Sequence, residues 1–399
     1  AFNLTLQLVS GRYPSKLFRD LRPRVSLDRV TGRISPLPGS QKLVIANGGA
    51  IPDTGEYGVY LAEANLKLGE LDEEFVYESR EGDTFSLGTH NWKIVKIEAD
   101  RVVVEHGSPH QARMPFWRGE SVSRSARTGR RMGEVLRTIA EKGESAYKWA
   151  VQSLPVDERA ARGLCDLVSA QVGTAGESGL PTDRRIVLET FPDEVGALRL
   201  ALLSVFGGRI HHALRIALTA LIKRELGMEP ESVCGDNGVL IRLPDGDAPA
   251  PRDLIRRLTP ALACDLITED LPNTALFGLR FRHNAARALL LPGAGPGKRT
   301  PMWLQRLKAK DLLAIARSFD GFPIVVETFR ECLQDYLELD ELRKILSQVQ
   351  SGEIELSVVE RQTPSPFAAS MLFDFQAVYQ YEWDEPKAVA ERKHAPQER

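Results

Sequence analysis

Residues 92–106, WKIVKIEADRVVVEH, carry the clearest structural signal in the sequence. Apolar and polar residues alternate on both sides of a polar turn at 98–101, which is typical of two antiparallel strands joined as a hairpin. A strand of this kind exposes one face and buries the other. The stretch therefore predicts a β-hairpin whose apolar face packs against further β structure.

Further short β-rich runs precede this hairpin and are separated by turns rich in Gly, Asn and Asp. The runs are KLVIAN (42–47), YGVYLAEA (57–64), EEFVYES (73–79) and DTFSLG (83–88). Several short strands at such spacing indicate a small barrel or sandwich. We expect residues 36–125 to form a β-rich barrel domain.

The segment before these strands has a different texture. Residues 1–35 predict a helix, a basic segment that contains Pro14 and Pro23, and a short strand around 29–34. This order resembles the closing part of a small helical DNA-binding module such as a winged helix. The chain opens inside an apolar pattern without a helix-start signal, and we expect it to be a fragment of something longer.

Helical periodicity dominates the part of the chain after residue 125. We expect helices at 129–172, 196–226 (with a possible break at 207–208), 251–291, 303–350 and 363–383, and strands at 184–191, 233–247 and 353–360. Residues 126–399 are therefore expected to form a large helical and mixed α/β part. The predicted fold class is α+β, with a winged-helix remnant, a β-barrel part and this larger part.

Composition sets broad limits on the class of protein. The 399 residues carry a formal net charge of −2, and 43% of them are hydrophobic. No run of eighteen apolar residues is present, so we expect no membrane partner. The four cysteines are scattered singly, which disfavours a disulfide framework or a structural zinc site and fits a reducing cytoplasm.

The near-neutral net charge hides three basic segments. Residues 11–33 hold seven Lys and Arg against two Asp, 113–131 hold six Arg against one Glu, and 280–310 hold eight Lys and Arg without an acid. A charge run is usually a solvated face. Three such blocks in one chain favour a surface that binds a polyanion.

The sequence contains no complete motif for catalysis. The segment Pro292 to Thr300 fails the phosphate-loop pattern, because Pro replaces the first Gly and Arg299 stands where Ser or Thr would bind Mg²⁺. His211 and His212 are adjacent on a predicted helix and point about 100° apart, so they cannot chelate one metal together. We expect a structural or partner-facing role for this pair, and neither a cofactor nor a metal site in this chain.

Two short segments are candidates for contact with nucleic acid. MPFWRG (114–119) places Trp117 beside a Phe and between Arg113 and Arg118, as base stacking next to a phosphate track requires. NGGAIPDTG (47–55) carries a single large apolar side chain, Ile51, which can act as a wedge between bases. The alternatives are that Trp117 fills the barrel interior and that Ile51 anchors its loop inward.

Long strings of the sequence resemble one known family. They are GRYPSKLFRDLRPRVSLDRVTG, NGGAIPDTGEYGVYL, GELDEEFVYESREGDTFSLGTHNWKI, MPFWRG, LPTDRRIVLETFPDE, GDNGVLIRLPD, FRHNAARALLLP, RTPMWLQRLKAKDLL and TPSPFAASMLFDF. Together they are similar to the Lhr (large helicase-related) family of superfamily 2 DEAD/DEAH-box DNA helicases, in the part downstream of the motor domains. The chain departs from the family at 203–207, where it reads LSVFG instead of HSPFG.

The resemblance implies an ATP-dependent 3′-to-5′ translocase of DNA repair, with ATP and Mg²⁺ bound in motor domains of the same polypeptide that this chain lacks. It implies single-stranded DNA as a partner, together with a DNA–DNA or RNA–DNA duplex. Trp117 and Ile51 are then expected to contact the strand. The expected phosphate contacts are Arg113, Arg118, Arg124, Arg127, Arg130 and Arg131. For Arg280, Arg282 and Arg287 a structural ion-pair role is at least as well supported.

The sequence is also compatible with two other classes of function. A winged-helix remnant joined to a β-barrel also looks like a stand-alone module that binds damaged DNA or acts as a glycosylase. That function requires a positioned carboxylate or Gln beside a base pocket, and the sequence does not single one out. A purely architectural scaffold is a third alternative, which the basic segments disfavour.

Overall fold

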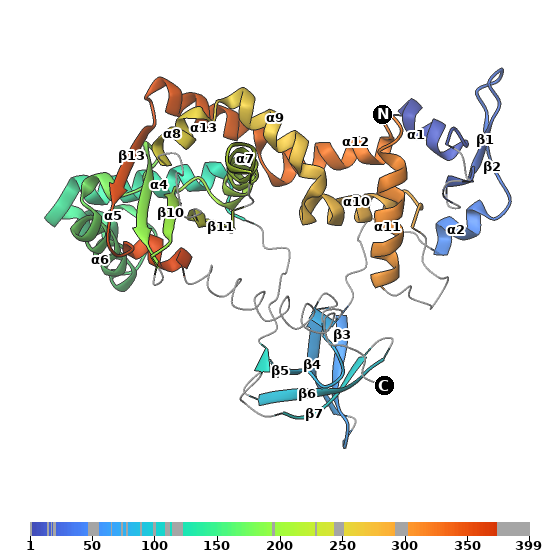
Figure 1. Cartoon of the computed structure of the whole chain (residues 1–399), viewed down its shortest axis with the longest axis horizontal. Helices are drawn as coiled ribbons and strands as arrows, with labels where there is room; N and C mark the ends of the chain where they lie inside the picture. Colours follow the sequence, from blue (N-terminus) through green and yellow to red (C-terminus); the bar gives the residue numbers. More distant parts are fainter. Residues whose placement is uncertain are drawn as a thin grey trace, which may run out of the picture. The chain divides into compact units, whose positions relative to one another are not determined.

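The computed structural model of the chain contains two compact units (Figure 1). The first unit comprises residues 1–121 and 275–331, and the second comprises 122–274 and 332–399. The described residues are 2–13, 16, 18, 21–46, 56–64, 66–72, 75–76, 79–87, 90–98, 101–107, 112–113, 123–193, 196–227, 230–242, 251–291 and 302–372. The domain boundaries predicted after residues 35 and 125 stay predictions.

A short antiparallel hairpin of β1 (Val25–Leu27) and β2 (Ile34–Pro36) lies near the start of the first unit. The single strand predicted at 29–34 is wrong, because most of those residues form the turn between these two strands. Asp28 fixes the turn, since its carboxylate accepts a hydrogen bond from the Val30 N–H at 2.9 Å. An Asp that bonds to backbone two residues later is a common turn-forming device.

Helix α2 (Ser40–Ala46) includes most of the run predicted as a strand at 42–47. The prediction is wrong because an apolar run of this length has no periodicity that separates a strand from a helix. The Ser40 hydroxyl donates a hydrogen bond to the Arg24 carbonyl at 2.6 Å. This bond joins the start of the helix to the residue before β1.

Three helices from the later stretch of sequence belong to the first unit: α10 (Ala275–Arg287), α11 (Met302–Ala316) and α12 (Pro323–Arg330). Helix α1 (Phe2–Val9) contacts α12. The buried Tyr13 ring packs against Phe319 and Phe322, with ring centroids 5.2 Å and 4.7 Å away. These aromatic contacts explain why the two stretches form one unit.

A six-stranded mixed sheet forms the β-rich part of the first unit, in the order β4-β3-β7-β6-β5-β8. Its strands are β3 (Glu56–Leu61), β4 (Leu66–Asp72), β5 (Thr84–Leu87), β6 (His90–Ile97), β7 (Arg101–His106) and β8 (Ala112–Arg113). The predicted hairpin at 92–106 is confirmed, because β6 and β7 pair antiparallel with Trp92 opposite His106. The buried cluster on this sheet contains Val59, Leu71, Phe75, Val76, Phe85, Trp92, Ile94, Val102 and Val104.

The barrel predicted for residues 36–125 is not closed by the strands that the structure describes. Closure requires hydrogen bonds between the first and last strands of the sheet. Instead β4 pairs with β3, and β8, which has only two residues, pairs with β5. The described chain is therefore α+β with an open mixed sheet in this part.

Five strands form the sheet of the second unit, in the order β11-β12-β10-β9-β13. They are β9 (Arg185–Pro192), β10 (Leu198–Leu203), β11 (Ser232–Gly235), β12 (Gly238–Arg242) and β13 (Glu355–Glu360). Neighbours are antiparallel except β13, which runs parallel to β9. The strands predicted at 184–191 and 353–360 are confirmed. The single strand predicted at 233–247 is wrong for residues 233–242, which belong to the β11–β12 hairpin, and residues 243–247 lie outside the described residues.

The long helix predicted at 196–226 is wrong in its first part. Strand β10 occupies residues 198–203, and helix α7 (Gly208–Leu226) begins only after the predicted break. β10 lies in the middle of the sheet, and its residues from Arg199 to Leu203 are all buried. A strand buried on both faces lacks the alternation that would identify it in the sequence.

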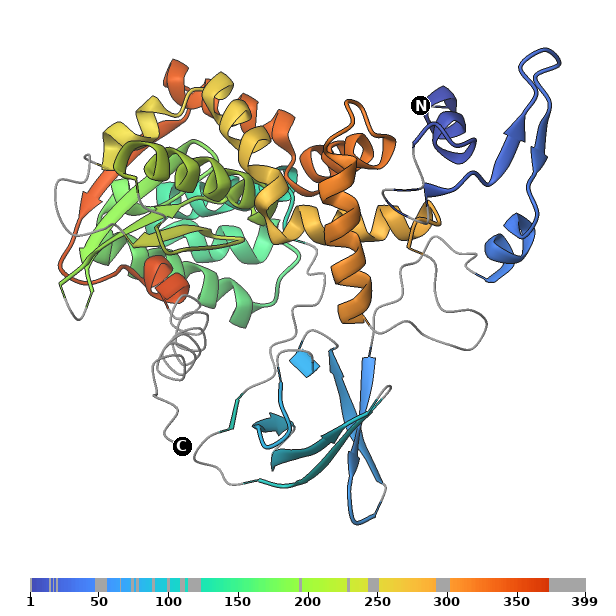
Figure 2. The ribbon, with the colours of Figure 1, turned by 45° about the vertical axis from the view of Figure 1, so that its right-hand side comes forward.

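The other helices of the second unit are α4 (Ala126–Lys142), α5 (Ala146–Ser153), α6 (Glu158–Ala175), α8 (Pro251–Arg257), α9 (Pro260–Asp270) and α13 (Leu339–Ser351). Helix α7 contacts β11, β12, α9 and α13, and Figure 2 shows α7, α9 and α13 above the strands. Residues 366–372 are also helical, and Ala368 and Met371 pack with Val187 and Phe191 of the sheet. None of the described helices is long and apolar enough to cross a membrane.

Candidate nucleic-acid interface

The predicted nucleic-acid-binding residues fall in different parts of the chain. Ile51, Trp117 and Arg118 lie outside the described residues. Arg113 ends β8 in the first unit, where its backbone pairs with Phe85 of β5. The other four predicted residues gather at the start of α4 in the second unit: Arg124, Arg127, Arg130 and Arg131.

The start of α4 is stabilised by two polar caps. The Ser125 side chain accepts a hydrogen bond from the Thr128 N–H, as an N-cap residue does. The Ala126 N–H donates to one carboxylate oxygen of Glu338 at 3.0 Å, and the other oxygen accepts from the Arg209 guanidinium at 3.1 Å. A carboxylate at a helix N-terminus is favoured by the helix dipole. Glu338 therefore links α4 to the first turn of α7.

Arg124, just before α4, is held by the turn between β11 and β12. Its backbone N–H and that of Gly208 donate to the same Asp236 carboxylate oxygen, each at 2.8 Å. Its guanidinium donates to the Asp236 carbonyl and, at 3.2 Å, to the Asn237 side-chain oxygen. Burial lowers the pKa of Arg124, and the charge of Asp236 opposes that effect. Arg124 thus connects α4, α7 and the β11–β12 hairpin.

Gly207 permits this close approach of two backbone segments. Its φ is 91°, and a Cβ atom at this position would lie 2.1 Å from the Arg124 carbonyl oxygen. Only glycine adopts such a conformation without strain and leaves that space open. The segment 203–207, where the sequence departs from the Lhr pattern, therefore ends in a turn that packs directly on the predicted basic segment.

The three remaining arginines of α4 differ in their surroundings. Arg130 is half-buried, because its guanidinium donates to the Gln348 side-chain oxygen at 2.7 Å and lies 5.0 Å from the centre of the Phe206 ring. Arg127 is exposed, and the Arg131 side chain is 80% exposed and pairs with Glu134 at 2.8 Å. Residues four apart lie on one helix face. Arg127 and Arg131 are therefore the accessible pair.

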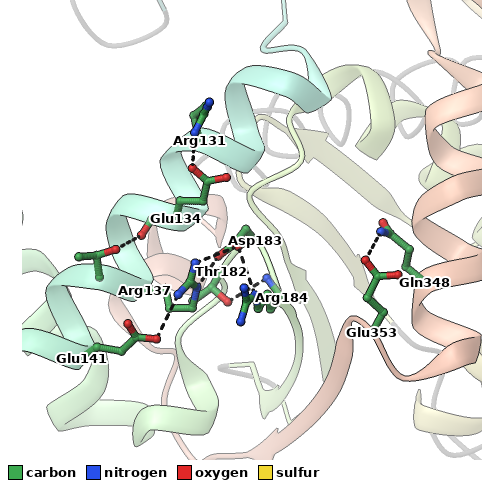
Figure 3. A network of polar contacts seen from close by, with 10 residues as sticks. Arg131, Glu134, Arg137, Glu141, Thr182, Asp183, Arg184, Gln348 and Glu353 are labelled. Carbon is green, nitrogen blue, oxygen red and sulfur yellow. Dashed lines mark hydrogen bonds and ion pairs between the residues drawn. The ribbon is translucent and has the colours of Figure 1, made fainter.

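A neighbouring cluster of charges was not singled out by the sequence (Figure 3). Arg137 of α4 donates two hydrogen bonds to the Asp183 carboxylate, at 2.9 Å and 3.3 Å, and these raise the pKa of Arg137. Arg184 lies 3.8 Å from the same carboxylate and has a 71% exposed side chain. The adjacent Arg184 and Arg185 in LPTDRR were the available signal. Arg184 adds an exposed cation beside α4.

The α10 arginines of the third basic segment lie in structural surroundings. Arg280 and Arg282 of α10 are buried. Arg280 and Arg287 each lie 3.9 Å from Glu331, whose other carboxylate oxygen accepts a hydrogen bond from Asn284 at 2.7 Å. The ion-pair alternative stated for Arg280 and Arg287 is confirmed.

His211 also has the structural role expected of it. Its Nδ1 bonds to the Gly235 carbonyl at 2.7 Å, which makes Nδ1 the donor. Burial lowers the pKa of His211 to about 4. A neutral buried imidazole therefore connects α7 to the β11–β12 turn. Among the described residues no three His, Cys, Asp or Glu side chains converge as metal ligands would.

Two family models match the chain. The winged helix domain of large helicase-related protein matches residues 1–114, and the DEAD/H associated model matches residues 180–368. The first match covers both sheets of the first unit. The second covers all five strands of the second unit's sheet and helices α7 to α13, whereas α4, α5 and α6 lie outside both matches.

Curated relatives match nearly the whole chain. An "Lhr helicase/ probable uracil glycosylase" of Mycolicibacterium smegmatis is 42% identical over 399 residues, which is 99% of this chain and 26% of the relative. The "Lhr helicase/uracil glycosylase" of Escherichia coli is 40% identical over 98% of this chain and 25% of its own length. The chain thus spans about a quarter of either relative.

A solved structure is similar in fold as well as in sequence. The Mycobacterium smegmatis helicase Lhr, bound to single-stranded DNA and AMP-PNP, matches with a TM-score of 0.70 and 36% identity. The match covers 93% of this chain and 42% of that one.

Proposed function

This chain belongs to the Lhr family of helicases, and we propose that it is the part of an ATP-dependent DNA helicase that grips the single strand. The observation that carries the proposal is the likeness, over 93% of the chain, to a solved Lhr helicase with single-stranded DNA bound. The accessible arginines of α4 supply donors suited to phosphate oxygens. Contacts of this kind position a strand without reading its sequence.

The motor of this helicase lies, in this proposal, in the remainder of a longer polypeptide. The two bacterial relatives have about three quarters of their length outside the matched region. ATP and Mg²⁺ bind there, and translocation runs 3′ to 5′ in the service of DNA repair. The open sheet of the first unit and the second unit then act on the strand that the motor delivers.

Within the interface, Trp117 stacks on a base and Ile51 separates the strands. Arg113 and Arg118 flank Trp117 in the sequence and contact adjacent phosphates. In the second unit, Arg127 and Arg131 of α4 contact phosphates as well. A base stacked on an aromatic ring contributes about 1–3 kcal/mol to binding and tolerates any sequence. This combination suits an enzyme that must move along arbitrary DNA.

Substitution of Trp117 tests the stacking role. Trp117→Ala is expected to weaken binding of single-stranded DNA by about 1–3 kcal/mol and to leave the melting temperature nearly unchanged. If Trp117 instead fills the protein interior, the free energy of unfolding falls by about 3–5 kcal/mol. Trp149→Ala, in the half-buried face of α5, is the matched control, since it is expected to affect stability and not binding.

Substitution of Ile51 tests strand separation. In the full-length helicase, Ile51→Ala is expected to reduce unwinding while DNA-dependent ATP hydrolysis persists, because a wedge couples translocation to strand opening. A parallel loss of both activities, together with a lower melting temperature, would assign Ile51 to the protein interior.

A uracil glycosylase activity is the second candidate, and the names of the two bacterial relatives favour it. The test is incubation of this chain with single-stranded DNA that contains one uracil, followed by alkali to cleave abasic sites. Strand cleavage that depends on uracil would place the glycosylase in this region. Intact DNA, with binding retained, is the result that the strand-gripping function predicts.

A further inference from the structure

Three rings form a cluster at one end of the first unit's sheet. The rings of Trp92 on β6 and His106 on β7 are stacked, with centroids 4.7 Å apart and an angle of 30° between their planes. The His90 ring lies 5.9 Å from Trp92 and 6.2 Å from His106. Trp92 is only 6% exposed, whereas both histidines are exposed. The cluster therefore consists of two solvent-exposed histidines next to a buried indole.

Hydrogen bonds within the protein hold the indole and the backbone of this cluster in place. The Trp92 indole N–H donates a hydrogen bond to the Leu87 carbonyl at 3.2 Å. The backbone after His106 passes close to β6, since the Gly107 N–H donates to the Asn91 carbonyl at 2.9 Å. A Cβ atom on Gly107 would lie 3.1 Å from the Trp92 carbonyl carbon. A rigid site loses little conformational entropy when it binds a flat ligand.

The register of the sheet relates the ring cluster to Arg113 of β8, the described residue of the proposed interface in this unit. His106 lies opposite Trp92, Trp92 lies opposite Phe85, and Phe85 lies opposite Arg113. Residues opposite one another on neighbouring strands occupy the same face. The backbone positions of this row therefore lead from the rings through the buried Phe85 to Arg113, directly before the segment 114–119 in the sequence. The other face of the same hairpin carries a different feature, the ion pair of Lys93 with Glu105 at 3.0 Å.

We propose that this cluster binds an unpaired nucleobase of single-stranded DNA, which stacks on the exposed face of the His106 ring with His90 at its edge. Histidine is among the side chains on which splayed bases stack, and stacking tolerates any base. The inference rests on the proposed strand-gripping function and extends it to a second contact point. It assigns His106 and His90 to DNA, and it assigns Trp92 the role of supporting His106.

Two substitutions of His106 distinguish two possible roles of its ring: stacking on a base of the DNA, or only shielding the Trp92 indole from solvent. His106→Leu keeps an apolar cover of similar size but has no ring, whereas His106→Phe keeps a ring. Val95→Ala is the matched control, because Val95 is a 42% exposed side chain on the same strand as Trp92. Each variant of the 399-residue chain is titrated with two fluorescent probes in the presence of EDTA. One probe is an oligothymidylate, and the other has the same length with abasic residues in its centre.

His106→Leu is expected to weaken binding of the thymidylate probe about fivefold, which corresponds to the lower end of the range for one base–aromatic stack. It should leave binding of the abasic probe unchanged. His106→Phe and Val95→Ala should bind both probes as tightly as the native chain does. His90→Ala should lose affinity for the thymidylate probe only, and that loss should be smaller than the loss for His106→Leu.

The contrary outcomes are distinct. If His106→Leu binds thymidylate like the native chain while Trp117→Ala binds it more weakly, the second contact does not exist and the proposed function stands. If His106→Phe loses as much affinity as His106→Leu and both melt at a lower temperature, His106 only covers Trp92. If the native chain binds neither probe, the proposed function fails and the inference fails with it.

Discussion

At the residue scale, His211 makes the second unit sensitive to acid. Its pKa in the folded chain is about 4, because burial disfavours the charged imidazole more than the hydrogen bond from Nδ1 to the Gly235 carbonyl favours it. A histidine in the unfolded chain has a pKa near 6.5. Between these two values the unfolded state binds more protons than the folded state. The free energy of unfolding therefore falls as the pH decreases from about 6.5 to about 4.

The size of this effect follows from the difference between the two pKa values, and reaches about 3 kcal/mol at the acid end. Urea unfolding of the native chain and of His211→Asn at several pH values between about 4.5 and 7.5 measures it. Asn keeps a donor near the Gly235 carbonyl and does not titrate, so its stability should change less over this range. If the free energy of unfolding changes equally with pH in the two proteins, groups other than His211 cause the acid sensitivity.

The arginines of α4 separate into binding and structural residues. Arg127→Gln with Arg131→Gln is expected to leave the melting temperature unchanged, because both side chains are exposed. It should reduce the slope of log affinity against log salt by about 0.7 for each phosphate that the variant no longer neutralises. Arg130→Gln removes the bond to Gln348 and the packing on Phe206, so it should lower stability instead. If the slope of log affinity against log salt is the same for the native chain and both variants, α4 does not contact the phosphates of the bound strand.

At the scale of elements, the turn that starts α7 depends on glycine. Gly207→Ala forces a Cβ into a position 2.1 Å from the Arg124 carbonyl oxygen, at a φ of 91°. Gly196→Ala is the matched control, because its φ is 87° and no atom lies within 4 Å of its Cβ position. The strained conformation alone costs about 1–3 kcal/mol. Thermal unfolding should therefore show a larger loss for Gly207→Ala, and equal losses would mean that the two segments separate easily.

Elements with a clear sequence period were predictable, and buried or short apolar elements were not. The hairpin at 92–106 was predictable because apolar Trp92 and Ile94 alternate with polar Lys93. The irregular pairing at Val95, an exposed apolar residue, was not predictable. Strand β10 was not, because it is buried on both faces. The sequence also could not predict that the described strands of the first unit's six-stranded sheet do not close into a barrel, since closure depends on pairing between strands distant in the chain.

The candidate site shows a similar division. A count of basic residues located the α4 arginines, but it could not show that Arg124 and Arg130 are engaged by Asp236 and Gln348. Those partners lie more than a hundred residues away. The ring cluster was not predictable from the separate positions of Trp92 and His106 either, because it depends on the register of β6 with β7.

At the scale of the whole molecule, the chain is expected to hydrolyse no ATP, with or without DNA. The sequence segment that comes nearest to a phosphate loop, at 292–300, has Arg299 where a Mg²⁺-binding hydroxyl belongs. Phosphate release by highly purified protein measures this. DNA-stimulated release that Lys298→Ala abolishes would contradict the placement of the motor outside this chain.

The proposed function requires that this chain bind single-stranded DNA without regard to its sequence. The most direct measurement is a fluorescence-anisotropy titration of the 399-residue chain with an oligothymidylate, a mixed-sequence single strand and a blunt duplex, at several salt concentrations. We expect similar affinities for the two single strands, weaker binding of the duplex, and an affinity that falls steeply with salt because the contacts are mainly to phosphate. Affinity that is indifferent to salt, or the absence of binding to either single strand, would contradict the proposed function.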